Sequence, residues 1–116
     1  LEQASKYLRK LRDNMLRNPF AFGHLLLAAD SYVDGAPEIA IVGPRAEAAP
    51  LLEIANHRYA PTYSVALHDP SSKIPDVLAA TLTDRPLQNG KPAAYVCRHF
   101  SCDAPVTSAR ELEGKL

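Results

Sequence analysis

The sequence carries no net charge, since its 116 residues include thirteen basic and thirteen acidic side chains. Proteins that bind nucleic acid through phosphate contacts show a basic excess, and this charge balance gives no support to such a partner. Long apolar runs are missing as well. The longest, residues 21–29, contains a glycine and a histidine and is far shorter than a bilayer span. The sequence therefore predicts neither a nucleic-acid partner nor a membrane partner.

Cysteine is scarce, because the chain contains Cys97 and Cys102 alone. Two cysteines are too few for a disulfide scaffold, and the charged first segment does not match an apolar signal peptide. A reducing, cytoplasmic setting is therefore expected. The chain begins at Leu1 rather than at a methionine, which suggests a piece of a longer protein.

What is present is ordinary globular composition, with 47% hydrophobic and 22% charged residues. That balance excludes a disordered chain. The length suits one hydrophobic core, and two independent cores are not expected.

Two helices are predicted at the N-terminal end, forming a hairpin over residues 1–35. Residues 2–16 place apolar side chains at helical spacing, and Asn18 followed by Pro19 is a helix start signal for a second helix over 19–34 that ends near Gly35. Apolar residues surround this second helix almost completely, which predicts a surface that another copy or another part of a longer chain covers. They are Phe20, Phe22, Leu25, Leu26, Leu27 and Tyr32.

Residues 36–116 predict a small α/β domain. Short apolar runs alternate with helical segments, which is typical of parallel strands joined by right-handed crossovers. We expect a three-stranded parallel sheet with flanking helices (β-α-β-α-β-α) and with the first strand in the middle. Ser108 and Glu111 have the spacing of a capping box at the start of the last helix. The strands are expected near 38–43, 62–67 and 93–97, and the helices near 47–58, 75–82 and 109–115.

The carboxyl ends of these strands are where an open parallel sheet binds ligands. The segment Gly43-Pro44-Arg45 is either an anion site at a helix start or a tight turn, and the turn is favoured. His68 and Asp69 are either a base with its orienting carboxylate or part of a turn, and again the turn is favoured. Glycine-rich nucleotide motifs and a serine nucleophile elbow are absent from the sequence.

The densest group of reactive side chains lies between Cys97 and Cys102. One interpretation is a metal site of Cys97, His99 and Cys102, with His68 as a fourth ligand. A second is a redox pair, and a third is two partly buried thiols without chemistry. We favour the third and expect the cysteines to be close together but reduced, with no metal and no cofactor. Only Arg98 and His99 lie near enough in the sequence to stabilise a thiolate.

Three segments carry a family resemblance: Asn18–Asp30 (NPFAFGHLLLAAD), Glu38–Gly43 (EIAIVG) and Ala94–Thr107 (AYVCRHFSCDAPVT). Together they resemble the C-terminal end of the thioredoxin-domain-containing proteins related to spermatogenesis-associated protein 20. Members of that family join a thioredoxin-like domain to an α/α toroid similar to six-hairpin glycosidases. The likeness covers nearly the whole chain and is strongest in the last segment.

The resemblance implies a C-terminal piece whose first 35 residues close the toroid. The family's redox motif and most of any toroid site would lie outside this chain, and only Cys97 and Cys102 match recurring positions. The expected function is a non-catalytic accessory domain that packs against the toroid and docks the thioredoxin-like domain. The alternative is a part of a redox or sugar-modifying enzyme that uses the two cysteines. The expected partner is the remainder of the parent chain, with self-association of the isolated piece.

Overall fold

The computed structural model describes residues 2–58, 62–99 and 101–116. Leu1 and Phe100, which belong to segments discussed above, lie outside these residues. The chain divides into two compact units, Leu1–Ala36 and Pro37–Leu116. In the described part of the chain, none of the helices combines the length and the apolar character needed to cross a membrane.

The first unit consists of consecutive helical segments. Helix α1 (Glu2–Arg17) matches the predicted first helix. The predicted second helix is divided into a 3-10 turn η1 (Pro19–Phe22), helix α2 (Gly23–Asp30) and a π-helical turn η2 (Ser31–Gly35). Asn18 makes no side-chain capping hydrogen bond, so that part of the start signal is wrong, whereas Gly35 ends the helical region with a φ of +75° as expected.

Apolar side chains of the first unit remain exposed, as predicted. Among residues 2–36 only Met15 is buried, and no side chain of α2 is. Phe20 is 99% exposed, Val33 70% and Leu16 66%. The described residues of this unit form no hydrophobic core cluster, and the core expected from the chain length lies in the second unit, as two clusters on the two faces of its sheet.

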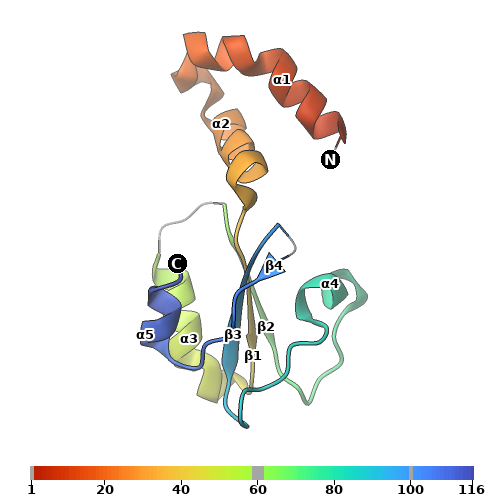
Figure 1. Cartoon of the computed structure of the whole chain (residues 1–116), viewed down its shortest axis with the longest axis vertical. Coiled ribbons are helices and arrows are strands. Elements are labelled where there is room, and N and C mark those ends of the chain that lie inside the picture. Colours follow the sequence, from red (N-terminus) through yellow and green to blue (C-terminus); the bar gives the residue numbers. More distant parts are fainter. Residues whose placement is uncertain (1, 59–61, 100) are drawn as a thin grey trace. The chain divides into compact units, whose positions relative to one another are not determined.

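The second unit is built on one four-stranded sheet with the order β2-β1-β3-β4 (Figure 1). Strands β1 (Glu38–Val42) and β2 (Ser64–His68) are parallel, and β1 lies between β2 and β3, as predicted. Strand β3 (Ala93–Arg98) is antiparallel to β1, and β4 (Ser101–Cys102) is antiparallel to β3. The architecture is mixed α/β, but the prediction of a wholly parallel three-stranded sheet is wrong.

The connection between β2 and β3 starts and ends at the same end of the sheet, because His68 and Ala93 both lie opposite Val42. Helix α4 (Ala79–Leu82) has four residues and advances about 6 Å, so it does not itself span a five-residue strand of about 16 Å as a crossover helix would. Instead, Asn89 and Gly90 form a tight turn with φ values of +52° and +75°, and β3 starts opposite Val42.

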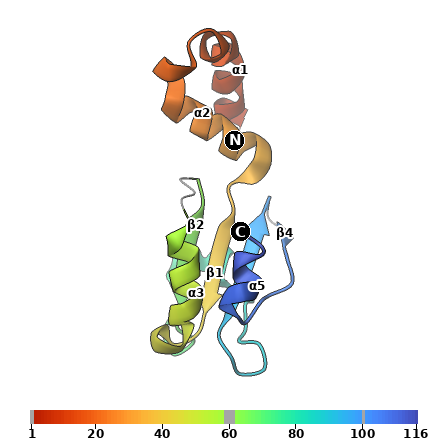
Figure 2. The same cartoon turned by 90° about the vertical axis from the view of Figure 1, so that its left-hand side faces the viewer.

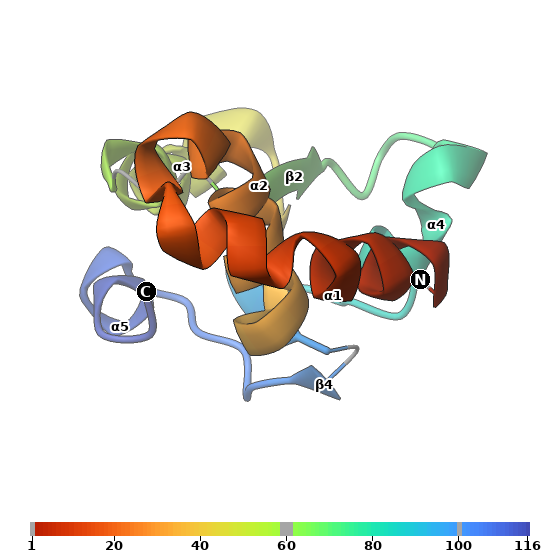
Figure 3. The ribbon, with the colours of Figure 1, turned by 90° about the horizontal axis from the view of Figure 1, so that it is seen from above.

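Helices α3 (Arg45–His57) and α5 (Ala109–Glu113) lie side by side on one face of the sheet, as Figure 2 shows. The short η3 (Asp76–Leu78) and α4 lie on the opposite face (Figure 3). Strand residues alternate between the two faces. Ile39 and Ile41 pack with α3 and α5, while Ala40, Val42, Tyr95 and Cys97 form a second cluster with Leu82.

Candidate functional site

The predicted site residues lie at two opposite ends of the sheet. Val42 is paired with His68, so the segment that follows β1 and the segment that follows β2 share one end. Cys97 is paired with Glu38, at the start of β1, and therefore lies at the other end. The expectation that all these side chains gather on one edge is wrong, because β3 runs antiparallel to its neighbour.

The segment Gly43–Arg45 is a tight connection between β1 and α3. The amide of Gly43 donates to the carbonyl of His68 at 2.9 Å, and α3 begins without a side-chain cap. Arg45 is exposed, and within the described residues its guanidinium makes no hydrogen bond. The turn interpretation is therefore favoured over an anion site.

Asp69 organises the turn that follows β2. Its carboxylate accepts hydrogen bonds from the amide of Ser71 at 2.9 Å and from the Ser71 hydroxyl at 2.8 Å. The amide of Ser71 contributes most to lowering the pKa of Asp69, followed by the hydroxyl, and His68 adds a smaller effect. The carboxylate is thus engaged by the turn, and no hydrogen bond joins it to His68 in the described part of the chain.

Cys97 and Cys102 form a disulfide, with Cα atoms 3.9 Å apart. They are directly opposite partners in the β3–β4 pair. His99, which follows β3, has a φ of +50°, a left-handed conformation typical of tight turns. The expected proximity is confirmed, whereas the expected reduced state is wrong. A turn was predicted after Cys97, but not the antiparallel strand that places Cys102 across from it.

The two sulfurs lie in different surroundings. Cys97 is 3% exposed and belongs to the cluster under α4, whereas Cys102 is exposed on the edge strand β4. Residue Cys102 is therefore open to solvent, whereas residue Cys97 is enclosed by protein.

Arg85 is the charged residue in contact with this disulfide. Its Nη2 lies 3.3 Å from Sγ of Cys97 and 3.3 Å from Sγ of Cys102. Its Nη1 donates to the carbonyl of Thr83 at 3.3 Å. The Nε atom is buried and has no hydrogen-bond partner among the described residues.

Tyr95 holds the segment that carries Arg85. The Tyr95 hydroxyl donates to the carbonyl of Pro86 at 2.6 Å and accepts from Nε2 of Gln88 at 3.0 Å. The Arg85 guanidinium lies 5.9 Å from the centre of the Tyr95 ring, within the range of a cation–π contact. The strand β3 thus supplies both the buried cysteine and the aromatic ring that fixes the cation beside it.

The predicted thiolate partners are not the observed ones. Arg98 and His99 are exposed, and in residues 62–99 and 101–116 neither donates a hydrogen bond to a sulfur. His68 lies at the other end of the sheet and cannot complete a metal site with the cysteines. Over the described ranges, no three His, Cys, Asp or Glu residues form a group suited to a metal.

Arg85 and Tyr95 belong to the site, although the sequence did not predict either of them as a site residue. Arg85 lies twelve residues before Cys97 and seventeen before Cys102, just beyond the helix predicted near 75–82. No local spacing links it to the cysteines. The contact exists because the segment after α4 packs along β3, where Tyr95 binds the carbonyl of Pro86.

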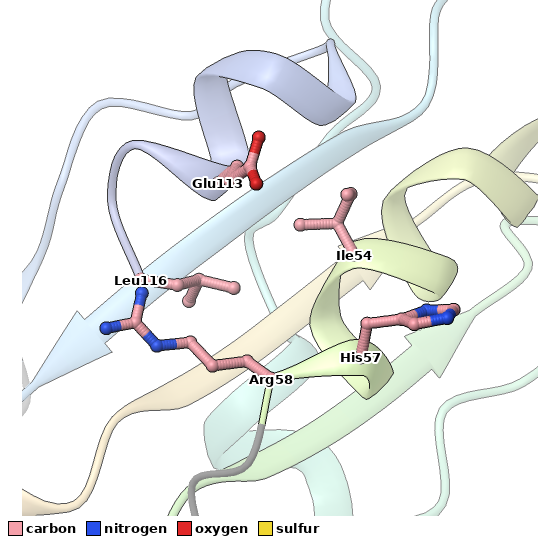
Figure 4. A pocket seen from close by; sticks show the side chains of 5 residues that line it. All are labelled: Ile54, His57, Arg58, Glu113 and Leu116. Carbon is pink, nitrogen blue, oxygen red and sulfur yellow. The ribbon is translucent and has the colours of Figure 1, made fainter.

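A separate cavity of about 300 Å³ lies between α3 and the C-terminal end of the chain (Figure 4). Its wall contains one cation and one carboxylate, and it holds no residue predicted as a site. The lining side chains are Ile54, His57, Arg58, Glu113 and Leu116. His57 is engaged by its own helix, where Nδ1 contacts the carbonyl of Glu53 at 2.9 Å. The disulfide with its arginine is therefore the stronger candidate site.

Comparison of the chain with family models, with curated proteins and with solved structures gives no match.

Proposed function

We propose that Pro37–Leu116 is a thiol–disulfide exchange module whose reactive centre is the Cys97–Cys102 pair. The observation that carries the proposal is the unequal exposure of the two cysteine residues, since Cys102 is exposed and Cys97 is buried. An incoming thiolate can reach Cys102, while Cys97 is held by the sheet and remains ready to close the bond again. The exchange needs no large backbone movement, because the residues are already opposite one another.

The exchange balances as a transfer of two electrons from a dithiol to the disulfide. A partner thiolate attacks Sγ of Cys102, and a mixed disulfide forms as the bond to Cys97 breaks. The electron pair leaves on Sγ of Cys97. The partner's second thiol is then deprotonated. It attacks the partner's first sulfur, which is bonded to Cys102 in the mixed disulfide, and so releases Cys102. The partner is oxidised and its two protons pass to solvent, one of which reprotonates the Cys102 thiolate.

A purely structural role for the bridge is less favoured. The two cysteines are five residues apart, so the bridge closes a very short loop and adds about 2 kcal/mol in the chain-entropy account. The hairpin is also closed by its own hydrogen bonds, since Asp103 donates to the carbonyl of Val96 at 3.0 Å. In the reducing, cytoplasmic setting that we propose, disulfides are mostly transient and serve catalysis or sensing.

The partner that we propose is a protein with a Cys-x-x-Cys dithiol. The family resemblance supports this choice, because its members carry a thioredoxin-like domain in the same polypeptide. The alternative expectation, a sugar-modifying site, stays a prediction.

The exchange is tested by treating the folded chain with dithiothreitol and labelling free thiols. We expect the bond to open while the circular dichroism spectrum is retained, because the sheet does not depend on the bridge. In Cys97→Ser the exposed Cys102 should then form a mixed disulfide with oxidised glutathione, whereas Cys102→Ser should react slowly through the buried Cys97. A bond that opens only in denaturant, or equal reactivity of the two variants, would contradict the proposal.

A second role, accessory docking, is favoured by the exposed apolar side chains of the first unit. Phe20, Leu16 and Val33 are each more than half exposed, which is unusual for large apolar residues of a helical segment. We propose that Leu1–Ala36 is covered by the remainder of a parent chain, an α/α toroid in the resembled family. The two roles concern different units and are compatible.

A further inference from the structure

Arg85 is a cation without a counter-ion in the part of the chain that the structure describes. Neither observed ion pair involves it, and its Nε atom is enclosed without an acceptor. Its Nη2 faces two sulfurs that are neutral while the disulfide is closed. Partial removal of a cation from water without a paired anion is unfavourable. In the oxidised state, the Arg85 guanidinium therefore has no anion among the described residues to balance its charge.

Reduction supplies the missing negative charge. When the bond opens, a thiolate forms at a position that already lies 3.3 Å from Nη2. A guanidinium is attracted more strongly to a thiolate than to a neutral disulfide sulfur, which is only a weak acceptor. Arg85 therefore interacts more strongly with the reduced pair than with the oxidised pair.

We infer that Arg85 stabilises the reduced state of the Cys97–Cys102 pair and makes the disulfide an oxidant of dithiol proteins. This inference rests on the proposed function and gives it a direction. A disulfide whose reduced form is stabilised accepts electrons more readily. The substrate is then a reduced dithiol that leaves as a disulfide, rather than a disulfide that is reduced by this chain.

The buried sulfur benefits most from the cation. Attack on the exposed Cys102 places the leaving electron pair on Cys97, which has little access to water. A thiolate in such surroundings needs a nearby positive charge. Arg85 meets this need from the neighbouring segment, with Tyr95 fixing its position. Arg85 is thus a positioning and charge-stabilising residue for the exchange.

Other charged groups around the hairpin do not replace Arg85. Arg98 and His99 are exposed beside it. Asp103, the nearest carboxylate in sequence to Cys102, is engaged by Lys115 at 3.3 Å. Asp84 precedes Arg85, and no ion pair between them occurs within the described residues.

The test measures the redox equilibrium of the whole chain in mixtures of 2-mercaptoethanol and its disulfide, which are both uncharged. Arg85→Gln should lower the equilibrium constant for reduction of the protein about tenfold, the loss expected for a charged hydrogen bond. Arg98→Gln removes the same charge from an exposed neighbour and should change this equilibrium constant less than about twofold. The equilibrium constant of Arg85→Lys should fall between those of wild type and Arg85→Gln, because lysine keeps the charge but lacks the planar fork of the guanidinium.

A salt series on the unmodified chain provides a measurement that does not depend on a variant folding. Screening of the attraction between guanidinium and thiolate should lower the same equilibrium constant as salt is added. An unchanged constant in folded Arg85→Gln, an equal loss in Arg98→Gln, or no salt dependence would overturn the role of Arg85. If the wild-type pair takes no electrons while the chain is folded, the proposed exchange itself fails.

Discussion

Gly43 adopts a backbone conformation that other residues take only with strain, since its φ is +147°. A Cβ atom at this position would lie 2.8 Å from Cβ and 2.9 Å from Cγ of Pro92. Gly43→Ala should therefore reduce the free energy of unfolding of the second unit by about 2 kcal/mol through overpacking and strain. Hydrogen exchange of the buried Ile39 and Ile41 amides measures this change.

Gly114→Ala is the matched control for this substitution. Gly114 has a φ of −69°, and an added Cβ would meet only backbone carbonyls at 3.6 and 3.7 Å, which is ordinary contact. We expect a change within about 0.5 kcal/mol. Equal effects of the two substitutions would show that the close approach of Pro92 does not limit the residue at position 43.

The individual residues of the candidate site differ in how far the sequence could predict their contacts. Cys97 and Cys102 could be predicted as neighbours because a short connection joins them. Their pairing could not be predicted, because it depends on a two-residue strand that has no periodic pattern. The contact of Arg85 with the cysteines could not be predicted for a different reason, since it depends on how the segment after α4 packs along β3.

Among the elements, α5 is the one whose start the sequence defines completely. The Ser108 hydroxyl accepts from the amide of Glu111 at 3.3 Å and donates to the Glu111 carboxylate at 2.8 Å. Ser108→Ala should lower the free energy of unfolding by about 1 kcal/mol near neutral pH, as expected for loss of an N-cap. Urea denaturation at several pH values measures the effect.

The pH dependence of this loss follows from Glu111. The Ser108 hydroxyl is the largest cause that lowers the pKa of Glu111 below 4.5, followed by the amide of Thr107. The folded chain therefore holds this proton less tightly than the unfolded chain, and the stabilisation is complete above pH 4.5. The difference between wild type and Ser108→Ala should shrink as the pH falls through the folded pKa. A difference that grows on acidification would contradict this account, and Ser64→Ala, an exposed serine on β2, serves as control.

Among the other elements, those with a clear sequence pattern could be predicted from the sequence. The strands β1 and β2 and the helix α3 were predictable because each strand has a short apolar run and α3 has a helical repeat, although only the run of β1 is buried. The direction of β3 was not, since three parallel strands and the observed mixed order share the same alternation of elements. The predicted helix near 75–82 did not reveal that the chain re-enters the sheet at the end where β2 stops, opposite Val42.

Across the whole molecule, the apolar character of the second helical segment proved the most informative sequence property. It predicted exposed large side chains, and the structure confirms this at Phe20, Leu26, Leu27 and Tyr32, whereas Phe22 and Leu25 are half-buried. The identity of what covers them could not be predicted, because an apolar surface gives no directional signal. Hydrophobic association depends on the area buried rather than on particular contacts.

The isolated chain should therefore associate with itself through Leu1–Ala36. We expect its mean mass in sedimentation to rise with concentration, since contiguous apolar side chains gain free energy when they leave water. Replacing Leu16 and Phe20 together by Gln should weaken this association, because the first is 66% and the second 99% exposed. Val77→Gln is the control, since Val77 is 89% exposed but lies in the second unit. A mass that stays that of a monomer at every concentration, or an equal effect of the control, would remove the argument that this helical unit is built to be covered.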